Sequence, residues 1–102
     1  MRNVIWSRDA LDDIKSVVRY IAKDKGSFAL TIADRIERSA NLLSTFATGR
    51  AGRAAGTYEK PVSDLPYTIA YLIEASTDGA EQVVILRVIH DARNWISDAW
   101  PD

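Results

Sequence analysis

The side chain best suited to proton transfer is His90, the only histidine among the 102 residues. An imidazole exchanges its proton near neutral pH, so His90 is the candidate general acid or base. Arg87 lies three residues earlier, and this odd spacing puts the two side chains on opposite faces of a strand unless the strand ends or bulges between them. A single histidine is also commonly structural. With no cysteine and no nearby carboxylate cluster, we expect neither a metal site nor a cofactor.

Two arginines, Arg50 and Arg53, lie in a segment that holds three glycines in the eight residues 49–56. Such a loop can present backbone amides and guanidinium groups to phosphate or to a partner. The alternative is an irregular, mobile surface loop with two solvated arginines. The segment is not a P-loop, because the sequence contains no G-x-x-x-x-G-K-[ST] pattern. The chain also has no nucleophile elbow and no dinucleotide fingerprint.

Residues 83–89 are almost continuously apolar, which predicts a central strand covered on both faces. Side chains alternate along a strand, and one of its faces would carry only Val84, Leu86 and Val88. We expect that apolar face to meet the helices, so that Arg87 lies on the opposite, open face of the sheet. There its planar guanidinium could contact an anion or a partner. The alternative is a structural ion pair with Glu59 or Glu74.

The elements around these side chains follow from capping and periodicity. Ser7 is a good N-cap for a first helix, and Gly26 is a plausible left-handed stop at its end. Ser27 can cap a second helix, and the short connection predicts an antiparallel helical hairpin. Strands are predicted at 3–6, 57–60, 67–73 and 83–89, and a short helix or coil at 91–98. The order β-α-α-β-β-β indicates an α+β fold, with the helical pair on one face of an antiparallel sheet.

The composition indicates one globular domain over residues 1–102, with 47% apolar and 26% charged residues. No apolar run approaches the roughly 20 residues of a membrane span, and the first residues do not resemble a signal peptide. The absence of cysteine favours a reducing cytoplasm.

Charge is unevenly distributed along the chain, although the net charge is only −1. Residues 1–60 hold 11 Lys and Arg against 7 Asp and Glu, a balance of +4, and residues 61–102 hold 2 against 7, a balance of −5. Such asymmetry can build a local field, or it can reflect solvated helix faces. A domain that gripped duplex DNA by its backbone would usually be more basic.

Four sequence features occur in a characteristic order. They are VIWSRDA at 4–10, YIA at 20–22, GRAGR at 49–53 with GTYE at 56–59, and PYTIAY at 66–71 with ILRVIHDARNW at 85–95. Together they resemble the RelE/ParE superfamily of toxins, and its ParE-like branch in particular. The final stretch is the most specific of the four.

The resemblance implies a growth-arresting toxin of the plasmid-stabilisation kind. RelE-like members cleave mRNA, often on the ribosome, whereas ParE-like members are regarded as poisons of DNA gyrase. For an mRNA endonuclease, the candidate residues would be Tyr58, Lys60, Arg87, His90 and Arg93. Because Lys60 is the only basic residue in 57–71, this cluster would stabilise a dianionic transition state poorly. We therefore favour gyrase inhibition without chemistry, while an mRNA endonuclease and a degenerate toxin that keeps only antitoxin binding stay open.

The resemblance also implies a cognate antitoxin as partner, in complexes that are often heterotetramers and that reach operator DNA only through the antitoxin. We expect the antitoxin to cover apolar surface and arginines, and its acidic residues to pair with the basic N-terminal half or with Arg87. The expected contacts with antitoxin or target are Arg50, Arg53, Tyr58, Lys60, Arg87 and Arg93. Trp95 and Trp100 are expected to pin the C-terminus to the body of the domain.

Overall fold

The computed structural model describes residues 2–91 and begins with strand β1 (Asn3–Trp6), which runs directly into helix α1 (Arg8–Asn41). The predicted cap is confirmed, because the Ser7 side chain accepts a hydrogen bond of 3.1 Å from the amide of Ala10. A side-chain acceptor at this position satisfies one of the amides that a helix leaves unpaired at its start. Residues 92–102, which include Arg93, Trp95, Trp100 and the predicted 91–98 helix from its second residue on, lie outside the described part of the chain.

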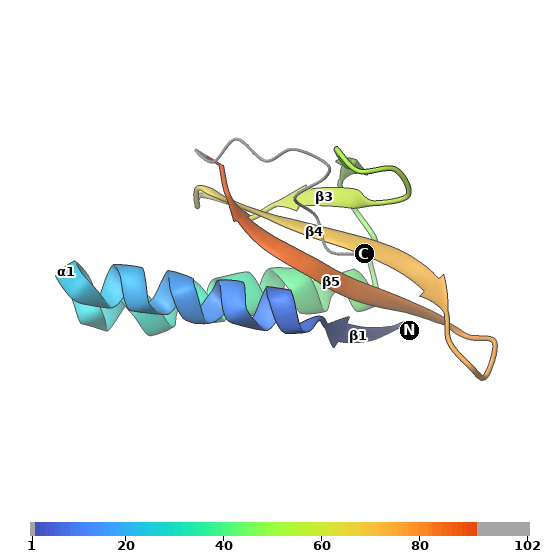
Figure 1. Cartoon of the computed structure of the whole chain (residues 1–102), viewed down its shortest axis with the longest axis horizontal. Coiled ribbons are helices and arrows are strands. Elements are labelled where there is room, and N and C mark those ends of the chain that lie inside the picture. Colours follow the sequence, from blue (N-terminus) through green and yellow to red (C-terminus); the bar gives the residue numbers. More distant parts are fainter. Residues whose placement is uncertain (1, 92–102) are drawn as a thin grey trace.

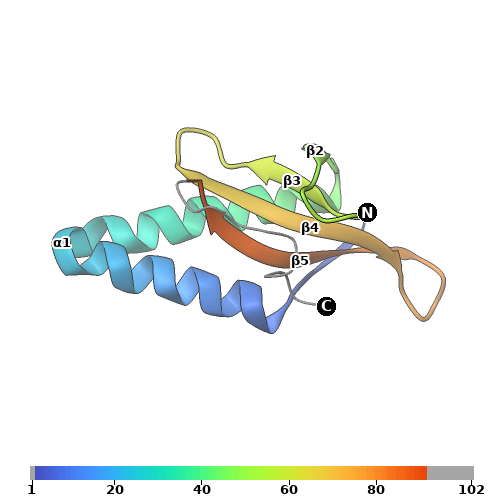
Figure 2. The ribbon, with the colours of Figure 1, turned by 45° about the horizontal axis from the view of Figure 1, so that its top comes forward.

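Helix α1 is two helical halves joined at a kink. Lys25 has φ −141° and ψ 71°, which are not helical, and the halves fold back side by side beneath the sheet (Figures 1 and 2). The predicted helical hairpin is therefore present. The expected left-handed stop at Gly26 is wrong, because the chain breaks the helix at Lys25 and Gly26 does not have a positive φ.

After α1 come a 3-10 turn, η1 (Leu42–Ser44), and the strands β2 (Arg50–Ala51), β3 (Tyr58–Pro61), β4 (Tyr67–Ala75) and β5 (Glu81–His90). The sheet has the order β1-β5-β4-β3-β2. Neighbouring strands are antiparallel except β1 and β5, which are parallel, so the expectation of a purely antiparallel sheet is wrong. Parallel strands need a long connection, and the chain between β1 and β5 supplies one.

The main hydrophobic core lies between α1 and the sheet. Strand β5 contributes Val83, Ile85 and Val88 to it, so the expectation that Val84, Leu86 and Val88 face the helices is wrong for Val84 and Leu86 and right for Val88. The reason is a β-bulge: Tyr71 pairs with Ile85 but Ala70 pairs with Arg87, which leaves Leu86 as an extra residue. A bulge shifts the phase of every side chain beyond it.

The other face of the sheet carries a second, smaller cluster. Ala70, Leu86 and Ile89 are buried in it, and Ala54, Leu72 and Val84 pack against them. We expected this face to be open, with guanidinium groups displayed on it. That expectation is wrong at the centre of the sheet, where apolar packing occupies the face.

The segment expected to be an irregular loop instead contains β2, which pairs with β3 through Arg50–Glu59 and Ala51–Tyr58. Gly49 makes this pairing possible, because its φ is +124° and a Cβ atom there would lie 2.5 Å from the carbonyl oxygen of Glu59. Both features exclude an ordinary side chain at this position.

Replacing Gly49 with alanine should lower the free energy of unfolding by about 2 kcal/mol or more, because backbone strain and a clash with β3 add together. Gly26→Ala is the matched control, because nothing lies within 4 Å of a Cβ atom there. Urea denaturation of both variants measures the difference. Equal stability of the two variants would contradict the described β2–β3 pairing.

Candidate functional site

Arg87 is bound to Asp13 of α1. Its Nε and Nη2 atoms donate to the two carboxylate oxygens of Asp13 at 2.7 and 2.9 Å, and the two side chains are only 16% and 15% exposed. This hydrogen bonding raises the pKa of Arg87 above its ordinary value. A planar two-pronged contact of this kind is the strong form of an arginine–carboxylate pair.

The expectation that the Arg87 guanidinium is displayed to a partner is therefore wrong, although Arg87 lies in register with Ala70 of the smaller cluster. The structural alternative, an ion pair, is present, but with a different partner from the two expected. Glu59 is bound by other arginines, and Glu74 accepts a hydrogen bond of 2.8 Å from Gln82. The carboxylate that binds Arg87 is 74 residues away in the sequence.

Asp13 also completes the edge of β5. Strand β1 pairs with β5 only as far as Ile85, and beyond that point α1 takes over the edge. The amide and hydroxyl of Ser7 donate to the carbonyls of Ile85 and Leu86, both at 3.0 Å, and Asp13 accepts the amide of Val88 at 2.9 Å. The start of α1 thus satisfies backbone groups that an edge strand would otherwise leave unpaired.

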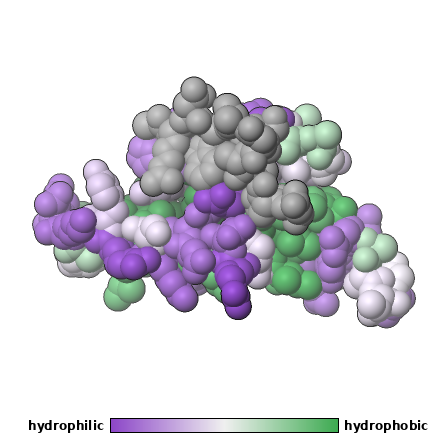
Figure 3. Space-filling view, viewed as in Figure 1, coloured by the Kyte–Doolittle hydropathy of each residue, from purple (hydrophilic) through white to green (hydrophobic). Residues whose placement is uncertain are grey.

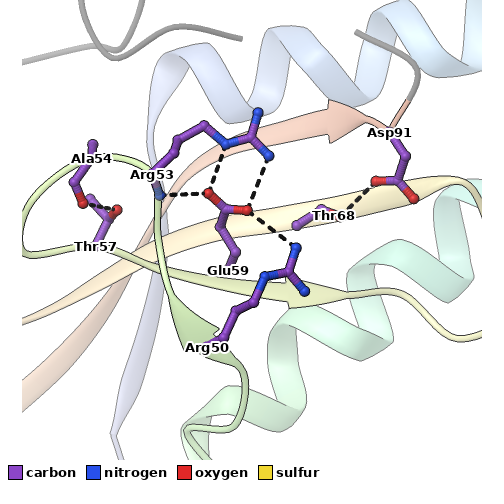
Figure 4. A network of polar contacts seen from close by, with 7 residues as sticks. All are labelled: Arg50, Arg53, Ala54, Thr57, Glu59, Thr68 and Asp91. Carbon is purple, nitrogen blue, oxygen red and sulfur yellow. Dashed lines mark hydrogen bonds and ion pairs between the residues drawn. The ribbon is translucent and has the colours of Figure 1, made fainter. Parts of the chain in front are cut away.

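A second polar cluster surrounds Glu59, which is 3% exposed and lies in register with Ala70 of the smaller cluster. Arg53 donates to it from its amide and Nε at 2.8 Å and from Nη2 at 3.1 Å, and Arg50 lies 3.6 Å away (Figure 4). Hydrogen bonding from Arg53 lowers the pKa of the Glu59 carboxyl below its ordinary value of 4.5. A buried carboxylate is tolerated here because it is paired and hydrogen-bonded.

These contacts change the interpretation of the two loop arginines. Arg53 fixes the β2–β3 turn onto a buried carboxylate, whereas Arg50 is 63% exposed and makes only the longer contact. The alternative of two merely solvated arginines does not describe Arg53. Nearby, Thr68 donates to Asp91 at 2.6 Å (Figure 4).

Lys60 of β3, and Tyr71 on which Tyr58 stacks, contact the segment that follows η1. The Tyr58 ring is stacked on Tyr71 with centroids 5.5 Å apart, and Tyr71 donates to the carbonyl of Thr48 at 2.6 Å. Lys60 donates to the hydroxyl of the same threonine at 2.6 Å. Tyr58 remains 43% exposed, so part of its ring is available to a partner.

His90 is the last residue of β5 and lies on the helix side of the sheet, in register with Tyr67 of the main core. The two rings meet edge to face, with centroids 5.2 Å apart. A pocket of about 290 Å³ lies beside them, lined by Asp13, Ser16, Val17, Tyr20, Tyr67, Val88 and His90. His90 therefore contacts Tyr67, and Tyr58 contacts Tyr71, at two positions four residues apart on β4.

Sequence reasoning missed Asp13, the residue that decides where Arg87 points. Three aspartates of the first turns, Asp9, Asp12 and Asp13, suit the positive end of the helix dipole, and this general effect conceals the separate role of Asp13. The available signal was its spacing, because Asp13 lies four residues before the buried Val17 and so borders the inner face of the helix. Within residues 2–91, the structure contains no group of three or more His, Cys, Asp or Glu that could hold a metal ion.

Comparisons with known proteins identify relatives of this chain. The family described as "ParE toxin of type II toxin-antitoxin system, parDE" matches residues 4–95. The chain belongs to the ParE toxin family. "Putative toxin Y4kP" of Sinorhizobium fredii (strain NBRC 101917 / NGR234) is 32% identical over 95 residues, covering 92% of this chain and 93% of that protein.

The fold is also that of a solved ParE-system structure. A chain of the "Chromosomal ParDE TA system from P. aeruginosa" superimposes with a TM-score of 0.79, covers 88% of this chain and 96% of its own length, and is 19% identical. This confirms the α+β architecture. In the described residues no helix is long and apolar enough to cross a membrane.

Replacing Asp13 or Arg87 with alanine should each cost about 2–4 kcal/mol of folding free energy, because the remaining partner is left mostly buried without its counter-charge. The double variant should lose less than the sum, with a coupling energy of about 1–3 kcal/mol. Urea denaturation of the four proteins measures this cycle. Additive losses would mean that the pair does not form in solution.

Acid should weaken the Glu59 cluster. Because the pKa of Glu59 is lower in the folded chain than in the unfolded one, its contribution is present above pH 4.5 and is lost as the pH falls below that value. Glu59→Gln should therefore reduce stability at pH 6 and flatten the pH dependence between 5 and 3, relative to the native protein. If the stability of the variant falls between pH 5 and 3 as steeply as that of the native protein, the pairing of Glu59 with Arg53 is contradicted.

Proposed function

We propose that this chain is a toxin that inhibits DNA gyrase by binding, without chemistry of its own, and that a cognate antitoxin neutralises it. Membership of the ParE toxin family supports the toxin role and the antitoxin partner. The pairing of Arg87 and of Arg53 with carboxylates supports inhibition by binding rather than by catalysis. Each guanidinium is already matched to a carboxylate that is largely buried.

Cleavage of RNA needs cationic groups that can stabilise a dianionic transition state, with a proton donor or acceptor beside them. Here the charge of Arg87 is balanced by Asp13, and the charge of Arg53 by Glu59. Lys60 donates to Thr48, whereas the His90 ring packs against Tyr67. The described side chains thus favour a surface that binds a macromolecule over a centre that cleaves one. Action on gyrase would take place in the cytoplasm.

The direct test is a supercoiling assay with purified gyrase and relaxed plasmid. The chain should block supercoiling or trap cleaved DNA, and prior mixing with the small protein encoded beside it should restore supercoiling. Asp13→Ala with Arg87→Ala, assayed below its unfolding temperature, should keep most of the inhibition, because the pair is structural.

Induction in cells without the antitoxin separates the alternatives. DNA-damage signalling with intact transcripts is expected. Cut transcripts with normal supercoiling would replace the proposal with an mRNA endonuclease. Unimpaired growth and no effect on gyrase would indicate a chain that keeps only antitoxin binding.

A further inference from the structure

Four cations in the described part of the chain have no partner, and they lie together. The structure describes 12 Lys and Arg residues, and eight of them contact a carboxylate, another hydrogen-bond acceptor or an aromatic ring. The remaining four are exposed and make no such contact: Arg8, Lys15, Arg19 and Lys23. We call them the α1 basic strip.

The strip follows from helix geometry. All four residues belong to the first half of α1, and their spacing of seven, four and four residues keeps them on one face of a helix with 3.6 residues per turn. At a rise of about 1.5 Å per residue the strip is about 22 Å long. Figure 3 shows hydrophilic side chains gathered over this half of α1. Asp12 is the one acidic residue of the same face, so the strip keeps an excess of three positive charges.

We propose that the α1 basic strip docks an acidic helical segment of the antitoxin, an inference that rests on the function proposed above. A helical partner could place carboxylates at the same three- and four-residue spacing, so that several pairs form at once. Leu11, between Arg8 and Lys15 in the sequence, is 45% exposed and supplies apolar area beside them. The long stems of Lys and Arg add to that area.

Two other occupants fit less well. Duplex DNA would meet a chain with a net charge of −1 and an acidic residue inside the strip. A second copy of the chain could offer the acidic β4–β5 turn, but Glu81 there is already paired with Arg2. An acidic protein segment can bind these cations, and neither of the two objections above applies to it.

The test measures binding of the small protein encoded beside this chain to three forms of the full chain. Lys15→Glu/Arg19→Glu reverses the centre of the strip. Lys25→Glu/Arg38→Glu is the matched control, with the same change of charge elsewhere on the exposed hairpin. Circular dichroism and thermal unfolding establish that all three are folded.

The strip variant should bind about tenfold or more weakly at low ionic strength, with the difference shrinking at high salt, while the control binds like the native chain. Equal affinity and equal salt dependence of the strip variant and the native chain would overturn the inference while leaving the proposed function intact. No binding by the native chain would overturn the antitoxin partnership, and the inference with it. Strip-dependent binding to a duplex oligonucleotide, or strip-dependent dimers of the chain alone, with unchanged affinity for the small protein, would also overturn it.

Discussion

The carboxylate of Asp13 joins the helical layer of this domain to the sheet through polar contacts. It accepts two hydrogen bonds from Arg87 and one from the Val88 amide, at the place where β1 no longer covers the edge of β5. Arg87 directly follows the bulge at Leu86, and because its side chain is only 16% exposed its charge must be paired. One carboxylate therefore fixes the position of α1, closes a sheet edge and neutralises a mid-strand guanidinium.

The described cations therefore include two groups: those that are paired with largely buried carboxylates and those that are exposed to solvent. Arg87 and Arg53 bind carboxylates that are largely buried, so their charge stabilises the fold and the β2–β3 turn. Among residues 2–91, the Lys and Arg side chains that contact no carboxylate, other acceptor or aromatic ring are exposed on α1. Such an arrangement separates the paired arginines of the scaffold from the exposed cations of α1.

The fold was largely predictable from the sequence, because capping at Ser7, helical periodicity and the apolar runs of β4 and β5 act over a few residues. The parallel pairing of β1 was not, because it depends on which strand becomes central. The site was predicted less well. A single bulged residue interrupts the regular alternation that was expected along β5, so Val84 and Leu86 face away from the main core. The partner of Arg87 lies 74 residues away, beyond the reach of any local pattern. Glu59 was considered as a partner for the wrong arginine.

Proton exchange at the Arg87 side chain tests the central claim most directly, namely that this guanidinium belongs to the scaffold. In NMR spectra of the native chain, the Nε proton of Arg87 and the amide proton of Val88 should exchange slowly with water, since both are donated to Asp13. The Nε proton of the exposed Arg8 supplies the internal reference for fast exchange. If the Arg87 proton exchanges as fast as that of Arg8, the guanidinium is open to solvent and its scaffold role is contradicted.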